Sequence, residues 1–199
     1  MNPAQSPIHL ATESAYIDDE PLDVLTPRTE LPKSVSVVVP CYNEEDVLHE
    51  LRTRLTDTLT SIGLPYEVVL VDDGSKDKTW SMLCQIRRED TRFKIIRLSR
   101  NYGHQIALTC GLDAARGDVV LAMDADLQDP PELLTEMLDK WKEGYDVVYG
   151  KRLRREGETK TKRFLSYAFY RVVTRITKIE IPEDTGDFRL FDRRALDAL

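Results

Sequence analysis

The sequence of 199 residues lacks any apolar stretch that approaches about 18 residues, the length that a membrane-spanning helix needs. Its first thirty residues also lack a basic start followed by an apolar run, which is the pattern of a secretory signal. We therefore expect neither a transmembrane helix nor an export signal in this sequence.

Cysteine is scarce as well. The three cysteines, Cys41, Cys84 and Cys110, are too few and too irregularly spaced for a disulfide framework or a zinc site. In the absence of an export signal, they are expected to be reduced thiols in a cytosolic compartment.

Two glycine-rich phosphate-binding motifs are missing, because no GxGxxG follows the first predicted strand and no GxxxxGK[ST] occurs anywhere. A general excess of basic residues is missing too, since 35 acidic residues outnumber 28 basic ones. Residues 151–178 carry ten Lys and Arg against two Glu, whereas the rest of the chain has a balance of −15. An acidic body with one basic segment argues against nucleic-acid binding and predicts contact with an anionic surface or substrate at one place.

The pattern of apolar residues predicts one domain of the α/β class, with a mostly parallel sheet flanked by helices. Residues 1–33 contain five prolines, an acidic cluster and no apolar periodicity, so we predict a disordered tail there. The domain then spans residues 34–199, which is enough for one sizeable core. Strands are expected at 35–39, 67–71, 94–98, 119–123 and 146–149, and helices at 44–62, 76–88, 104–115 and 131–141.

Polar residues follow most of these strands, and in such a sheet ligands bind at the carboxyl ends of the strands. Asp124, Asp126 and Gln128 come directly after the strand at 119–123. Alternate residues of an extended chain point to one side, so their oxygens can together hold a hard cation such as Mg²⁺ or Mn²⁺. An acidic turn that leads into a Pro-Pro helix start explains the same residues equally well.

Two other strand ends are ambiguous when taken alone. The carboxylates of Asp72 and Asp73 suit hydrogen bonds to a nucleobase and ribose, but Asp and Gly are also ordinary turn residues. Glu44 is equally consistent with an acidic residue in the first turn of a helix, where the helix dipole favours it. Tyr42 suits stacking on a base or simple packing.

Taken together, PCYNE (40–44), DDGS (72–75), DADLQDPPE (124–132) and GDFRLFDRR (186–194) resemble the GT-A glycosyltransferases of family 2. The segment SRNYGHQ (99–105) narrows the resemblance to the polyprenyl-phosphate glycosyltransferases, such as dolichyl-phosphate mannosyltransferases and the enzymes that load undecaprenyl phosphate with glucose or an aminoarabinose derivative. The resemblance covers about residues 34–199. It implies the GT-A fold and a metal-dependent, inverting transfer of a sugar from a nucleoside-diphosphate sugar to a polyprenyl phosphate at the cytoplasmic membrane face.

The resemblance also implies roles for individual residues. The nucleoside contacts would be Pro40, Tyr42, Glu44, Asp72 and Asp73. The diphosphate and its Mg²⁺ or Mn²⁺ would be held by Asp124, Asp126 and Gln128, with Arg152 as a further diphosphate contact. Asp187 and Arg189 would lie beside the reacting centre. The segment 99–105 leans toward UDP-sugars rather than GDP-mannose as donors.

Asp187 occupies the position of the customary base in family 2. However, a phosphate monoester has a second pKa of about 6 and is mostly dianionic at neutral pH, so it hardly needs deprotonation. We therefore hypothesise that Asp187 mainly orients Arg189 or the acceptor. His104, which opens a predicted helix, is expected to be structural more often than catalytic, and Trp80 and Tyr102 are expected in the core.

Residues 159–177 combine an apolar stripe that contains Phe164 and Phe169 with flanking Lys and Arg residues. This pattern predicts an interfacial membrane helix, although an ordinary helix packed on the sheet has a similar pattern. Relatives generally continue into membrane helices, whereas this sequence ends at Leu199 inside an apparent helix, so we expect a fragment. Two alternatives stay open: a soluble family 2 enzyme that acts on a saccharide hydroxyl, and a non-catalytic nucleotide-sugar-binding module.

Overall fold

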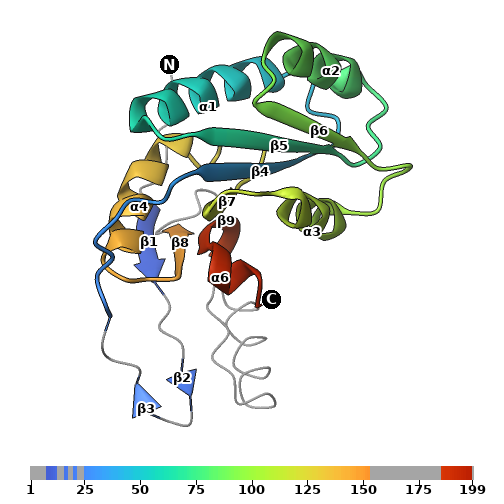
Figure 1. Cartoon of the computed structure of the whole chain (residues 1–199). Helices are drawn as coiled ribbons and strands as arrows, with labels where there is room; N and C mark the ends of the chain where they lie inside the picture. Colours follow the sequence, from blue (N-terminus) through green and yellow to red (C-terminus); the bar gives the residue numbers. More distant parts are fainter. Residues whose placement is uncertain (1–7, 13–15, 18–19, 22–24, 153–184, 199) are drawn as a thin grey trace, which may run out of the picture.

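The computed structural model describes residues 8–12, 16–17, 20–21, 25–152 and 185–198 (Figure 1). Its main feature is a seven-stranded sheet of order β1-β8-β9-β7-β4-β5-β6. The strands are β1 Ile8–Thr12, β4 Val35–Cys41, β5 Tyr66–Asp72, β6 Phe93–Arg97, β7 Val119–Ala122, β8 Val147–Arg152 and β9 Thr185–Asp192. β2 (Tyr16–Ile17) and β3 (Glu20–Pro21) pair with each other. The helices are α1 Leu48–Ile62, α2 Thr79–Glu89, α3 His104–Ala114, the 3₁₀ turn η1 Pro131–Leu133, α4 Leu134–Lys142 and α6 Arg193–Leu196.

The structure confirms the predicted α/β class, and each predicted strand or helix overlaps an observed one. Strands β4 to β8 all run in one direction, because β4, β5, β6 and β7 pair in parallel and β8 is antiparallel to β9, which is antiparallel to β7. β9 was not predicted as a strand. It separates β8 from the parallel strands and begins at the edge where they end.

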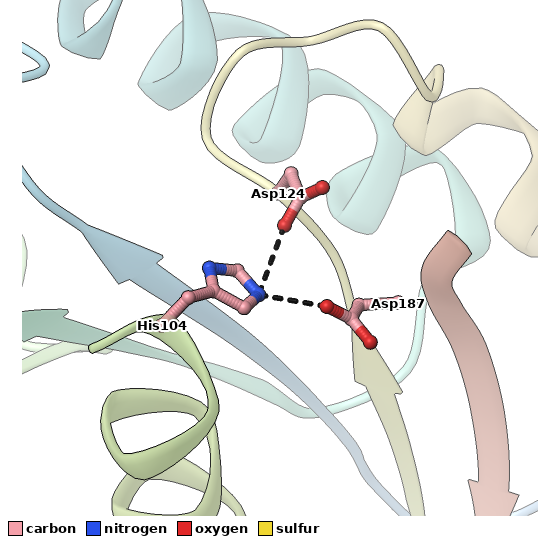
Figure 2. A group of neighbouring side chains, drawn as sticks. All are labelled: His104, Asp124 and Asp187. Carbon is pink, nitrogen blue, oxygen red and sulfur yellow. Dashed lines mark ion pairs between the residues drawn. The ribbon is translucent and has the colours of Figure 1, made fainter. Parts of the chain in front are cut away.

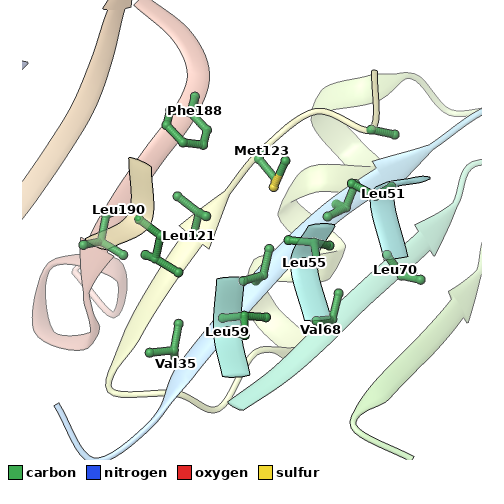
Figure 3. Close-up of a cluster of buried hydrophobic side chains, with 14 of the residues drawn as sticks. Val35, Leu51, Leu55, Leu59, Val68, Leu70, Leu121, Met123, Phe188 and Leu190 are labelled. Carbon is green, nitrogen blue, oxygen red and sulfur yellow. The ribbon is translucent and has the colours of Figure 1, made fainter. Parts of the chain in front are cut away.

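The two faces of the sheet bury two apolar clusters. On one face, side chains such as Leu51, Leu70 and Leu121 pack beneath α1, α2 and α4 (Figure 3). On the other face, Val38 and Val71 pack against Ala107 and Leu108 of α3. Successive residues of a strand point to opposite faces, so each strand supplies both clusters.

Helix α1 begins at Leu48, four residues later than Glu44, where the sequence predicted its start. It buries Leu48, Leu51, Leu55 and Leu59, which are spaced three or four residues apart. Full burial of such a side chain contributes about 1.5–3 kcal/mol, so this stripe fixes the helix on the sheet. The helix ends at Ile62 and is capped by Gly63, which has the left-handed conformation with φ of 75°.

The prediction that order begins at Ser34 is wrong for two parts of the N-terminal region. All five residues of β1 pair with β8, which would otherwise be an edge strand with unpaired backbone groups, and Leu10 packs against the larger core cluster. The proline and acidic content of residues 1–33 concealed this short apolar run.

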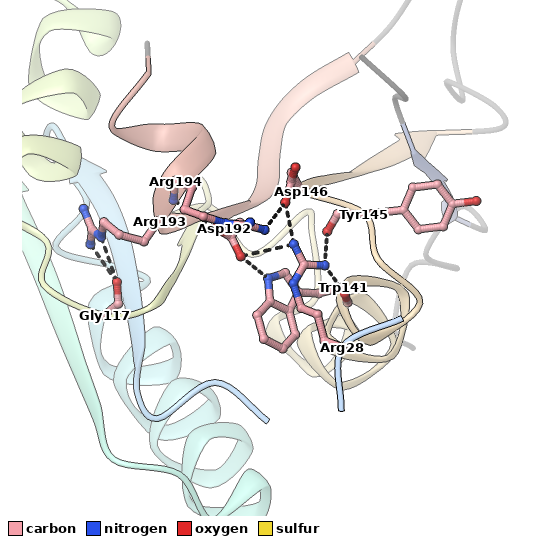
Figure 4. A network of polar contacts seen from close by, with 8 residues as sticks. All are labelled: Arg28, Gly117, Trp141, Tyr145, Asp146, Asp192, Arg193 and Arg194. Carbon is pink, nitrogen blue, oxygen red and sulfur yellow. Dashed lines mark hydrogen bonds and ion pairs between the residues drawn. The ribbon is translucent and has the colours of Figure 1, made fainter. Parts of the chain in front are cut away.

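Arg28 is the second ordered part of the predicted tail (Figure 4). Its guanidinium binds the backbone oxygens of Trp141 and Tyr145 and the carboxylates of Asp146 and Asp192. It also lies over the Trp141 ring, 4.4 Å from the ring centre. Since Asp192 is buried, Arg28 supplies a countercharge within the fold rather than on a free tail.

Two expectations concern the membrane: an interfacial helix, and the absence of a transmembrane helix. The candidate interfacial helix at 159–177 lies outside the described residues. Within the described part of the chain, every helix is too short or too polar to cross a bilayer.

Candidate functional site

The carboxyl ends of β4, β5 and β7 surround a cavity of about 340 Å³ together with the start of α3 and of β9. This is the edge of the sheet where the sequence predicted the site. The lining residues are Pro40, Cys41, Tyr42, Glu44, Asp73, Asn101, His104, Ala107, Asp124, Ala125, Asp126 and Asp187. Burial, followed by the charges of Glu44 and Asp72, raises the pKa of the Cys41 thiol well above its usual range.

Three side chains from three different elements meet in this cavity. His104 Nε2 lies 2.8 Å from Asp187 Oδ2 and 3.3 Å from Asp124 Oδ1 (Figure 2). His104 is the first residue of α3, Asp124 follows β7, and Asp187 belongs to β9. One ligand atom from each residue lies within 4.8 Å of the other two, a separation that suits coordination of a single ion.

Strand alternation explains why Asp124 and Asp187 meet at α3. In β7, Leu121 and Met123 point into the core beneath α1, so Asp124 points to the α3 face. In β9, Phe188 joins that same core, which turns Asp187 to the α3 face as well. Because β9 runs opposite to β7, the beginning of β9 lies at the carboxyl edge.

Negative charge accumulates in this cavity. Burial raises the pKa of Asp124; His104 opposes the rise, and the charges of Asp126 and Asp187 add to it. The pKa of Glu44 is raised as well, first by burial and then by Asp126, Asp77 and Asp124. Asp124 Oδ1 is buried without a hydrogen-bond partner. A divalent cation would compensate these charges and satisfy this oxygen, so the residues present fit a metal ion.

Two of the three predicted metal ligands line the cavity, and the third does not. Asp124 and Asp126 line the cavity, but Gln128 is exposed and lies outside the lining. One oxygen of Asp126 accepts a hydrogen bond from the Gln128 backbone amide at 3.0 Å, within a turn that places Leu127 at φ of 58°. His104, which was expected to be structural more often than catalytic, contacts two of the carboxylates in the cavity.

Asp72 and Asp73 were both predicted as nucleoside contacts, but they point to opposite faces of the sheet. Asp73 lines the cavity, and its two oxygens accept hydrogen bonds from the backbone amides of Tyr102 and Gly103 at 2.7 and 2.9 Å. Asp72 is buried outside the cavity lining, where it accepts a bond from the Ser75 amide and lies 3.2 Å from Arg97 Nε. Of the pair, Asp73 is therefore the one placed to contact a ligand.

The loop that carries Tyr42 and Glu44 is bonded to the loop after β5. Asn43 has a φ of 57°, its amide donates to Ser75 Oγ, and its side-chain oxygen accepts from the Lys76 amide. The Glu44 amide donates to Thr79 Oγ1 at 2.8 Å. These bonds hold Pro40, Tyr42 and Glu44 at the cavity, with the Tyr42 ring exposed enough to stack on a ligand.

The remaining predicted residues have mixed outcomes. Arg189 pairs with Ala122 and Tyr149 in the sheet, on the same face of β9 as Asp187. The backbone of Arg152 ends β8, and its side chain lies outside the described residues. Trp80 packs against the core as predicted. The prediction for Tyr102 is wrong, because its ring is 43% exposed and lies beneath the Arg100 guanidinium.

Comparisons with known proteins identify the family. Residues 36–199 match the family described as Glycosyl transferase family 2. The chain is 51% identical over 165 residues to an uncharacterized glycosyltransferase of Synechocystis, a match that covers 83% of this chain and 52% of that protein. It is 35% identical over 163 residues to the bactoprenol glucosyl transferase of Shigella phage SfV, covering 82% of this chain and 53% of that protein.

The fold resembles that of a solved GT-A enzyme. A mannosyltransferase from Pyrobaculum calidifontis, in complex with GDP-Man and Mn²⁺, matches with a TM-score of 0.51 at 24% identity, over 90% of this chain and 50% of that one. The predicted GT-A fold is therefore confirmed. The chain spans about half the length of the curated relatives that it matches.

Proposed function

The chain belongs to glycosyl transferase family 2, and on that premise we propose that it transfers a sugar from a nucleoside-diphosphate sugar to a polyprenyl phosphate, with inversion at the anomeric carbon. The reaction would take place at the cytoplasmic face of a membrane. The observation that carries the proposal is the cavity in which a buried oxygen of Asp124, which accepts no hydrogen bond, lies 3.3 Å from His104 Nε2, with Asp187 beside the same nitrogen.

The residues of the cavity divide between donor and metal. Pro40, Tyr42, Glu44 and Asp73 would contact the nucleoside, and Arg152 with Arg189 would approach the diphosphate. Asp124 and Asp126 would hold Mg²⁺ or Mn²⁺, with Gln128 or His104 completing the set. The bound ion supplies electrostatic stabilisation of the negative charge that develops on the leaving diphosphate. The segment 99–105 favours a UDP-sugar as donor.

Two observations support a lipid phosphate as acceptor. The chain is 35% identical to a protein named bactoprenol glucosyl transferase, and its basic segment at 151–178 suits an anionic membrane surface. A phosphate acceptor is already ionised at neutral pH, so Asp187 would orient the acceptor or Arg189 rather than remove a proton. The position of Asp187 and Arg189 on one face of β9 is consistent with that role.

The direct test is transfer of labelled sugar to lipid. The full chain is incubated with UDP-[¹⁴C]glucose, undecaprenyl phosphate in anionic liposomes and Mn²⁺, and the label that enters an organic extract is counted. We expect lipid-bound label that disappears with chelator, with GDP-[¹⁴C]mannose as the comparison donor. Label that enters a saccharide acceptor but not the lipid would support the soluble family 2 alternative. Nucleotide binding without turnover on either acceptor would support a non-catalytic module.

The role of Asp187 has its own test in the same assay. Because a dianionic acceptor needs no base, Asp187→Asn should retain measurable transfer to undecaprenyl phosphate, whereas Asp126→Ala should lose it. Equal and complete loss in the two variants would contradict an orienting role for Asp187.

A further inference from the structure

The Asp187 carboxylate is held by the first turn of α3 rather than by its own strand. Gln105 Nε2 lies 3.1 Å from Asp187 Oδ2, and His104 Nε2 lies 2.8 Å from the same oxygen. Both nitrogens therefore contact Oδ2.

The backbone around Asp187 is irregular. Tyr149 of β8 pairs with Arg189, and Lys151 pairs with Thr185, so four residues of β9 span the distance of two residues of β8. Asp187 lies within this bulge. A bulge interrupts the regular hydrogen bonding of the ladder and redirects the side chains in it. Contacts from a neighbouring element must then fix the direction of the carboxylate.

The first turn of α3 is well placed to supply these contacts, because its own position is fixed. The Asp73 carboxylate accepts hydrogen bonds from the amides of Tyr102 and Gly103, the two residues before α3. Gly74 packs so closely on the same loop that an added Cβ would come within 2.6 Å of the Arg100 carbonyl carbon. The turn after β5 thus anchors the residues that precede His104 and Gln105.

We propose that Gln105 is a positioning residue that holds the Asp187 carboxylate in the orientation needed for sugar transfer. This inference rests on the proposed function, in which Asp187 lies beside the reacting centre. The amide nitrogen of Gln105 must face the carboxylate, because its carbonyl oxygen would be repelled there. Unlike a cationic partner, a neutral amide fixes the direction of Asp187 without neutralising the charge that the site uses.

Substitution with glutamate separates this role from simple packing. Gln105→Glu keeps the shape of the side chain but replaces the donor with a like charge, whereas Gln105→Leu removes the donor and adds no charge. We expect kcat to fall about tenfold in the Leu variant, the scale of a lost hydrogen bond to a charged group, and further in the Glu variant. The KM for the donor should stay within about twofold of wild type, because Gln105 holds Asp187 and not the nucleotide.

Gln85 provides matched controls on another helix. Its Nε2 donates to the Glu89 carboxylate at 2.8 Å on the exposed side of α2. Gln85→Glu and Gln85→Leu make the same chemical changes away from the cavity and should leave kcat unchanged. A packing role for Gln105 would give the opposite order, with Gln105→Glu less harmful than Gln105→Leu, and would overturn the proposal.

A double substitution tests whether Gln105 acts through Asp187. In an Asp187→Asn background, the like-charge contact no longer exists, so Gln105→Glu should cost no more than about twofold in kcat. If the fold-loss in kcat of the double variant equals the product of the fold-losses in the two single variants, the two residues act independently, and the proposal is overturned.

A spectroscopic measurement keeps the inference testable without turnover. The chain contains three histidines, and the ¹⁵N ring resonances of His104 are identified by their loss in His104→Asn. Displacement of Asp187 should shift His104 Nε2 in Gln105→Glu but not in Gln85→Glu. A shift in a chain that transfers no sugar would refute the proposed function and leave the positioning role intact. If wild type transfers sugar but the His104 Nε2 resonance does not shift in Gln105→Glu, the positioning role is refuted and the proposed function is not.

Discussion

β9 carries an aspartate near each of its ends, and the surroundings of the two carboxylates differ in charge. Asp192 ends the strand in a buried network that Trp141 Nε1, Arg28 and Arg194 supply with donors. Asp187 lies near the start of the strand and close to Asp124, in a cavity that Glu44, Asp73 and Asp126 also line. One end of the strand therefore lies among arginine donors, whereas the other lies among carboxylates with His104 as their basic neighbour.

The pKa values of the two clusters differ in direction. Burial opposes ionisation of Asp192, but hydrogen bonds from the Arg194 amide, Trp141 and the Arg194 side chain hold its pKa below the usual value. At the other end, burial and neighbouring carboxylates raise the pKa of Asp124, against the opposing effect of His104. Charge balanced within the protein stabilises the fold, whereas charge left unbalanced is available to a cation or a reacting group. We infer that the Asp192 end serves stability and the Asp124 end serves chemistry.

The largest effect that this comparison predicts is the loss of activity in Asp124→Asn. Because the variant removes a charge that would stabilise the reaction through the metal, sugar transfer should fall about 10²–10³-fold, the scale of one preorganised electrostatic group. The midpoint of urea unfolding should stay the same or rise, since a buried like charge disappears. Asp57→Asn, on the exposed side of α1, is the control and should change neither quantity. A large loss of stability in Asp124→Asn would contradict the division of roles.

The second effect is the mirror image, a loss of stability in Asp192→Asn. The change leaves the donors of Arg28 and Arg194 without one buried countercharge, so the free energy of unfolding should fall by about 2–3 kcal/mol. The KM for the donor should not change. Asp197→Asn breaks only an exposed pair with Arg193 and should cost less than about 1 kcal/mol. Equal losses in the two variants, measured by urea unfolding, would show that the Arg28 network contributes little.

The third effect is stabilisation by the metal. In the presence of Mn²⁺ at about ten times its dissociation constant, linkage predicts a gain of about 1.4 kcal/mol in the free energy of unfolding. Asp124→Asn should lose this gain, and Asp192→Asn should keep it, because Asp124 lines the cavity and Asp192 lies at the far end of β9 from it. Thermal unfolding with Mn²⁺ and with chelator measures the difference. Retention of the full gain in Asp124→Asn would place the ion elsewhere.

The sequence predicted one half of this comparison much better than the other. The motifs located Asp124, Asp126 and Asp187, and the strand and helix pattern predicted the edge at which they meet. These predictions succeeded because they depend on short-range sequence patterns: each predicted strand is a β-branched run, and the polar residues follow it directly. The Arg28 network depends instead on contacts between residues more than a hundred positions apart, which no local pattern contains.

The same limit explains the different positions of Asp72 and Asp73 and the unexpected contacts of His104. The predicted strands are apolar on both faces, so alternation gave no indication of which face each aspartate occupies. β9 was read as a site motif rather than as a strand, so nothing placed Asp187 next to α3. If β9 had been predicted as a strand, its apolar residues Phe188 and Leu190 would have indicated the face that points into the core. Asp187 would then have been expected on the other face, where α3 begins with His104.

The smallest effect is the pH dependence of stability in the presence of chelator. Because the pKa of Asp124 is raised in the folded chain, the folded state binds this proton more tightly than the unfolded chain does. Wild type should therefore gain stability relative to Asp124→Asn as the pH falls from the raised value toward the ordinary value of 3.8. Asp192 has the opposite sign: its stabilisation is complete above 3.8 and is lost as the pH falls through its lowered folded value. Urea unfolding of the three proteins at several pH values gives two difference curves. If both curves slope in the same direction, the two ends of β9 do not differ in their charge balance.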